Sequence, residues 1–167
     1  MTQRKVAYRV PLVLDGHAVQ CTLVTLEGIS HILIPDTNLP FKNERDVLRV
    51  MVADTITQLG WGHMDAFGLI WVREEQGQLA IDPVVYVRSI QTCIYESACG
   101  SGTIAVALAQ TPEGESSLTS VKQPSGSVLT AGINHSDPER GIGTTLRGPV
   151  QIRGDLNHLA VRQPADQ

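Results

Sequence analysis

The feature that most constrains this chain is an apolar run, Ile104 to Ala109, which directly follows the sequence Cys99-Gly-Ser-Gly-Thr. The run contains only isoleucine, alanine, valine and leucine, so a helix formed from it is apolar on every side. A helix of that kind is expected to be buried, and the two glycines before it permit a tight turn. The sequence therefore predicts a buried helix with Cys99 at, or just before, its N-terminus.

The thiol of Cys99 is predicted to lie beside unpaired backbone amides, those of Gly100, Ser101 and Gly102. The first turn of a helix leaves its N–H groups without intrahelical acceptors and carries the positive end of the helix dipole. This environment lowers the pKa of a thiol and provides a cradle for a carboxylate or phosphate. Two interpretations follow: a catalytic thiol beside an anion site, or a small buried hydrophobic residue before an ordinary turn.

The length and composition indicate one globular domain, residues 1–167. A chain of 167 residues, of which 42% are hydrophobic, has a sizeable core and forms two domains only with difficulty. The net charge of −4 and the isoelectric point near 5.7 argue against nucleic acids and anionic membranes as partners. No apolar segment is long enough to span a bilayer, and the first residues do not resemble a secretory signal.

The three cysteines, Cys21, Cys93 and Cys99, are an odd number. Their spacing matches neither a disulfide framework nor a metal site. Reduced thiols in a cytoplasmic protein fit this pattern best, and no metal ion is expected.

The rest of the chain is predicted to form many short strands and one further helix. That helix runs from Glu44 to Leu59, with Asn43 as its N-cap and Gly60 at its end. The segment Ser89 to Ala98 is predicted as a loop, and Asp82-Pro83 as a possible bulge. Together these elements predict an α+β domain in which a mostly antiparallel sheet wraps around the central hydrophobic helix. The expected strands are Val6–Leu14, Ala18–Leu26, Ser30–Pro35, Ala66–Val72, Leu79–Arg88, Leu118–Lys122, Ser127–Ile133, Thr144–Arg147 and Val150–Arg153.

Several blocks of sequence, in order along most of the chain, resemble the diaminopimelate epimerase superfamily. They are most similar to its histidine racemase branch, the enzymes that make D-histidine for opine-type metallophores. The blocks that carry the resemblance are Glu27 to Pro35, the helix from Glu44, Trp61-Gly-His63, Gly68-Leu-Ile, Pro83-Val-Val-Tyr-Val, Glu96 to Thr103, Gln123 to Leu129 and Leu146 to Val150.

The resemblance implies a family fold of two pseudosymmetric domains, each with a catalytic cysteine at the N-terminus of its central helix. The active site of such enzymes lies between the two domains. This chain resembles only one of them, and we expect it to correspond to the C-terminal domain. The resemblance therefore implies an oligomer: either a hetero-oligomer with a chain similar to the N-terminal half, or a homodimer with two Cys99 residues facing each other.

The resemblance also implies an isomerase that racemises or epimerises a small-molecule amino acid without a cofactor such as PLP. Such a reaction needs a base on one face of the α-carbon and an acid on the other. Cys99 would be one of these groups, and the amides of Gly100, Ser101 and Gly102 would bind the substrate carboxylate. Glu96 would orient the substrate amine or a partner thiol. His31 either lines the substrate pocket or is a hydrogen-bonded structural residue.

Two other functions remain open at this stage. Cys99 could be the nucleophile of a hydrolase or transferase, with His31 as its activating base. Alternatively, the domain could be a non-catalytic subunit that binds an amino acid. The identity of the amino acid also remains open, although no arginine lies between Arg88 and Cys99 to hold a second substrate carboxylate.

Overall fold

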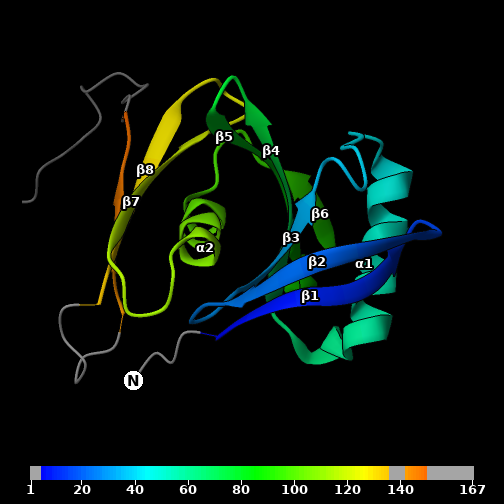
Figure 1. The fold of residues 1–167 in the computed structure, drawn as a ribbon. Helices are drawn as coiled ribbons and strands as arrows, with labels where there is room; N and C mark the ends of the chain where they lie inside the picture. The colour runs from blue at the N-terminus through cyan, green and yellow to red at the C-terminus, as the bar shows by residue number, and fades with distance from the viewer. Residues whose placement is uncertain (1–4, 136–141, 150–167) are drawn as a thin grey trace, which may run out of the picture.

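The computed structural model describes residues 5–135 and 142–149, and within these residues all strands join one mixed sheet (Figure 1). The strands follow the order β1-β2-β3-β4-β5-β7-β8-β9, and β6 pairs with β5 beside this path. The elements are β1 (Lys5–Leu14), β2 (His17–Thr25), β3 (Ser30–Pro35), α1 (Arg45–Leu59), η1 (Trp61–His63), β4 (Ala66–Glu75), β5 (Gln78–Val87), η2 (Arg88–Ile90), β6 (Thr92–Tyr95), α2 (Gly100–Gln110), β7 (Ser117–Lys122), β8 (Val128–Asn134) and β9 (Gly143–Arg147).

Most of the strand pairs are antiparallel, and β3–β4 and β5–β7 are the parallel pairs among the described strands. Strand β5 changes partner along its length: Leu79 and Ala80 pair with β7, whereas Val84 to Val87 pair with β6. This mixed sheet with two α-helices confirms the α+β class. Strands β1 and β2 form a hairpin at Asp15-Gly16, and both of these residues have positive φ angles, of 49° and 77°.

The sheet separates two hydrophobic cores because neighbouring residues of a strand point to opposite faces. In β3, Ile32 and Ile34 belong to the core that α1 covers, and Leu33 belongs to the core around α2. In β4, Trp71 and Ile70 divide in the same way. Strands β3 and β4 are therefore buried on both faces, which explains their nearly continuous apolar sequence.

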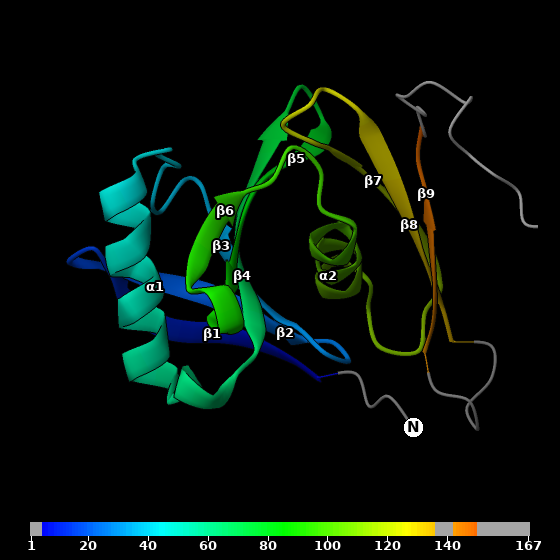
Figure 2. The ribbon, with the colours of Figure 1, turned by 180° about the vertical axis from the view of Figure 1, so that it is seen from behind.

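The two helices lie on opposite sides of the central strands, as Figures 1 and 2 show. Helix α1 contacts β1 and β6, whereas α2 contacts β2, β3, β4, β7, β8 and β9. Helix α1 ends at Leu59 with Gly60 as its C-cap, in the left-handed conformation, which confirms the predicted end of the helix. Its N-cap is Glu44 rather than Asn43. Helix α2 begins at Gly100 with Cys99 as its N-cap, as the sequence predicts.

Three details differ from the sequence-based expectations. The segment predicted as a loop, Ser89 to Ala98, contains η2 and the strand β6. The Asp82-Pro83 step does not bulge, because both residues keep a continuous register with β4. The strand expected at Val150–Arg153 lies outside the described residues. In the described part of the chain, no helix has the length and apolar character needed to span a membrane.

Candidate active site around Cys99

Cys99 caps α2 with its own side chain. Its backbone is extended, with φ −130° and ψ 105°, and its Sγ accepts a hydrogen bond of 3.3 Å from the amide of Gly102. The hydroxyl oxygen of Ser101 lies 3.6 Å from the same sulfur. A β-carbon added to Gly102 would lie only 3.1 Å from Sγ, so a glycine at this position gives the sulfur room to reach the helix end. The predicted placement of the thiol at the helix N-terminus is thus confirmed.

The backbone of Cys99 is held by two buried polar side chains that the sequence analysis did not single out. The Cys99 amide donates to Oε1 of Gln123 at 2.9 Å, and its carbonyl accepts from the Thr103 hydroxyl at 2.7 Å. Gln123 also donates to Thr103 Oγ1 and to the carbonyl of Val121, so all three hydrogen bonds of its amide group are within the core. Because these groups are buried and satisfied, they fix the position of the thiol.

The pKa of the Cys99 thiol is raised to about 11, which contradicts the lowered value expected from the helix terminus. Burial is the largest cause, since only 3% of the residue is exposed. Hydrogen bonding to Glu96 and the charge of that carboxylate raise the pKa further. The Ser101 hydroxyl and the Gly102 amide lower it, but by less. In this structure Cys99 is therefore a protonated thiol at neutral pH.

The strand β6 ends one residue before Glu96 and directs the Glu96 side chain toward Cys99. Tyr95, the last residue of β6, packs into the α1 core, so the next side chain points to the opposite face of the sheet, where α2 lies. The Glu96 amide donates to the carbonyl of Pro83 at 2.9 Å, which continues the pairing of β6 with β5. Between Glu96 and Cys99, the carbonyl of Ser97 accepts from the amide of Ser125 in the β7–β8 turn. The structure thus brings Glu96 and Cys99 together.

The amides at the start of α2 are the groups expected to bind an anion. The Gly102 amide donates to the cysteine sulfur, and no acceptor for the Gly100 or Ser101 amides is found among residues 5–135 and 142–149. Both residues are partly exposed. The Leu146 side chain from β9 lies over Gly100, since a β-carbon added there would be 2.7 Å from Leu146 Cδ2.

His31 is completely buried and lines neither the recess on β7, β8 and β9 nor the one between α1 and β6. It pairs with Gly68 of β4, and a β-carbon added to Gly68 would lie 2.9 Å from the ring carbon Cε1. Neither ring nitrogen has a hydrogen-bond partner within the described part of the chain. Burial lowers its pKa to about 4, so the ring is neutral near pH 7. The hydrogen bonds expected of a structural histidine are therefore not found among these residues, and a role of His31 in the substrate pocket stays a prediction.

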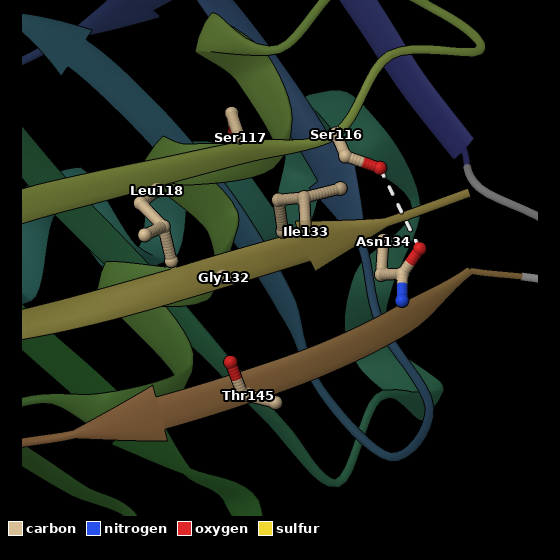
Figure 3. A pocket seen from close by; sticks show the side chains of 7 residues that line it. All are labelled: Ser116, Ser117, Leu118, Gly132, Ile133, Asn134 and Thr145. Carbon is tan, nitrogen blue, oxygen red and sulfur yellow. Dashed lines mark hydrogen bonds between the residues drawn. The ribbon is translucent and has the colours of Figure 1, made fainter. Parts of the chain in front are cut away.

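A shallow hollow of about 520 Å³ lies on β7, β8 and β9, and Figure 3 shows its lining. It contains the hydrogen bond from Ser116 to Asn134 and the exposed Leu118. None of its seven lining residues ionises near neutral pH, so it offers no acid or base. Within the ranges that the structure describes, no group of three or more His, Cys, Asp or Glu side chains is placed to hold a metal ion.

A thiol that caps a buried helix beside a carboxylate is a site suited to acid–base chemistry. Comparison with known proteins identifies the family. The chain belongs to the family described as the histidine racemase CntK N-terminal domain, whose model matches residues 1–155. The histidine racemase of Staphylococcus aureus (strain Mu50 / ATCC 700699) is 25% identical to it over 139 residues.

The comparisons confirm the resemblance to histidine racemases and correct one part of it. The matching model is that of an N-terminal domain, so the expected correspondence to a C-terminal domain is not supported. The alignment with the Staphylococcus aureus protein covers 82% of this chain and 48% of that racemase, so the chain spans about half the length of this curated relative. The wider diaminopimelate epimerase superfamily stays a prediction.

Proposed function

We propose that this chain supplies one half of a cofactor-independent amino-acid racemase, with Cys99 as one of two thiols that exchange the α-proton. The observation that supports this proposal most directly is the Cys99 thiol itself, which caps α2 in contact with Glu96 and two potential hydrogen-bond donors. Membership in the histidine racemase family supports the same reaction. Histidine is accordingly the first substrate to test.

In the proposed reaction Cys99 starts as the acid. Its raised pKa keeps the proton on sulfur until the opposite thiolate removes the α-proton of the substrate. Cys99 then donates its proton to the other face of the α-carbon and becomes a thiolate. The Gly102 amide, which donates to the sulfur, and the Ser101 hydroxyl, which lies 3.6 Å from it and can donate to a thiolate, stabilise that thiolate. For the reverse reaction the same thiolate acts as the base.

The substrate carboxylate needs fixed donors, because negative charge moves onto it as the α-proton leaves. The amides of Gly100 and Ser101 are suited to this role, since they lie at the positive end of α2. The Gly102 amide, also expected to bind the carboxylate, donates to the cysteine sulfur instead. Glu96 is placed to accept a hydrogen bond from the thiol or from the substrate amine.

The second thiol would come from another domain. Neither Cys21 nor Cys93 is grouped with Cys99 around α2: both pack in the core on the α1 side of the sheet. We therefore propose that a C-terminal-type racemase domain, or failing that a second copy of this chain, completes the site at the N-terminus of α2. A complementary domain is favoured because the family model describes one type of domain within a longer relative.

Exchange of the α-hydrogen in deuterated water tests the proposal. Histidine and a panel of other amino acids are incubated with the chain alone at several concentrations, and with candidate C-terminal-type domains. Deuterium incorporation followed by mass spectrometry is expected in the completed site and is expected to disappear in Cys99→Ala. Cys21→Ala is the matched control, because it also removes a buried thiol but leaves α2 unchanged.

The result also separates the competing functions. Exchange that rises with the square of the concentration of this chain alone indicates a homodimer. A domain that binds histidine equally well with and without the Cys99 thiol, and never exchanges its α-hydrogen, is a binding subunit. A covalent acyl-enzyme at Cys99 would indicate a hydrolase or transferase, although no hydrogen bond joins His31 to Cys99 within the described residues.

A further inference from the structure

A second recess lies between the first turns of α1 and the strand β6. Figure 2 shows that α1 and β6 lie on the other side of the central strands from α2. The volume of the recess is about 360 Å³, which is within the range of pockets that hold small molecules. Cys99 and Glu96 do not line it. We call it the α1–β6 pocket, and its polar lining residues include Asn43, Arg45, Arg49, Gln91, Thr92 and Cys93.

Two guanidinium groups give this pocket a positive charge. Arg45 and Arg49 are one helical turn apart, so their side chains leave α1 on the same side. Like charges at this spacing repel each other, and neither arginine forms an ion pair with any residue that the structure describes. None of the nine lining residues is acidic. The positive charge is therefore not balanced by the lining of the pocket.

Neutral donors and a helix end add to this arrangement. The Thr92 hydroxyl oxygen is buried and has no hydrogen-bond partner in the described chain, which is unfavourable unless a ligand or water satisfies it. The side-chain amides of Asn43 and Gln91 line the same space. Glu44 is the N-cap of α1, but its side chain makes no capping hydrogen bond. The free amides of the first turn of α1 therefore have no capping side chain as acceptor.

From these observations we infer that the α1–β6 pocket binds a small molecule through a carboxylate or phosphate group. The planar guanidinium groups of Arg45 and Arg49 would hold the anion by paired hydrogen bonds. Thr92, Asn43 and Gln91 would supply the neutral donors. This site is independent of the proposed racemase site, because the sheet lies between the pocket and α2.

The inference is tested by NMR titration of the full chain with inorganic phosphate and, separately, with succinate. Sodium chloride keeps the ionic strength constant, and succinamide serves as the uncharged counterpart of succinate. We expect saturable shifts in the amides of Gln91 to Tyr95 and of the first two turns of α1. Binding of phosphate but not succinate identifies a phosphate ligand, and the reverse identifies a carboxylate ligand.

Variants of the arginines decide whether the pocket itself is responsible. Arg45→Gln and Arg49→Gln should each weaken binding about tenfold, which corresponds to one lost charged hydrogen bond. Arg147→Gln, which removes the same charge from β9, should leave the affinity unchanged. The inference is overturned if neither anion gives saturable shifts, if succinamide binds as well as succinate, or if binding survives in the double arginine variant with an otherwise unchanged spectrum.

Discussion

Replacing Glu96 by glutamine should make Cys99 more reactive. The substitution removes the carboxylate charge, which together with its hydrogen bond raises the pKa of the thiol, and leaves burial almost unchanged. With a pKa of about 11, roughly one Cys99 in a thousand is a thiolate at about pH 8. Each unit by which the pKa falls gives about ten times more thiolate, while the nucleophilicity of the sulfur falls. The net alkylation rate should therefore rise about three- to fourfold per unit.

The assay is alkylation by iodoacetamide, read at the peptide that contains Cys99 by mass spectrometry across a range of pH. Glu74→Gln is the matched control, because Glu74 is exposed and its side chain is not among the groups that shift the Cys99 pKa. The midpoint of the rate profile should move to lower pH in Glu96→Gln only. An unchanged midpoint, or one that moves to higher pH, would refute the assigned role of the Glu96 carboxylate.

Three further outcomes follow from other buried groups. Because His31 has a pKa of about 4 in the folded chain and about 6.5 when unfolded, the unfolded state takes up a proton first as the pH falls. The free energy of unfolding, measured with urea, should thus drop by about 2 kcal/mol between pH 7 and pH 5. The His31→Gln variant should lack this loss. Gly68→Ala, which pushes a methyl group into the His31 ring, should lower the unfolding free energy by about 1–3 kcal/mol, whereas Gly62→Ala, with open space around it, should not. Gln123→Ala leaves the buried Cys99 amide without its acceptor and should cost about 2 kcal/mol in thermal unfolding experiments, together with most of the α-proton exchange.

The sequence predicts the position of Cys99 well because the signal is local. Two glycines, a threonine and an entirely apolar run follow one another, and their order alone defines a buried helix with a cysteine cap. The strand β6 was missed for the opposite reason. It has only four residues, and its stability comes from pairing with β5, where the partners run from Val87 with Thr92 to Val84 with Tyr95.

The direction of the Cys99 pKa shift could not be predicted from the local pattern. The helix terminus lowers this pKa, but burial and Glu96 together raise it by more. Burial depends on the packing of α2 against distant strands, and the direction of the Glu96 side chain depends on β6. The role of Gln123 also depends on tertiary structure, because Gln123 lies 24 positions after Cys99, whose amide donates to it.

The pairing of β6 with β5 limits how the sequence near the site can change in evolution. The register of β6 against β5 determines which face of the sheet the Glu96 side chain points to. A slip by a single position would turn the carboxylate toward α1 and leave the thiol without its neighbour. Insertions in the preceding turn should therefore be tolerated only when they leave this alignment intact.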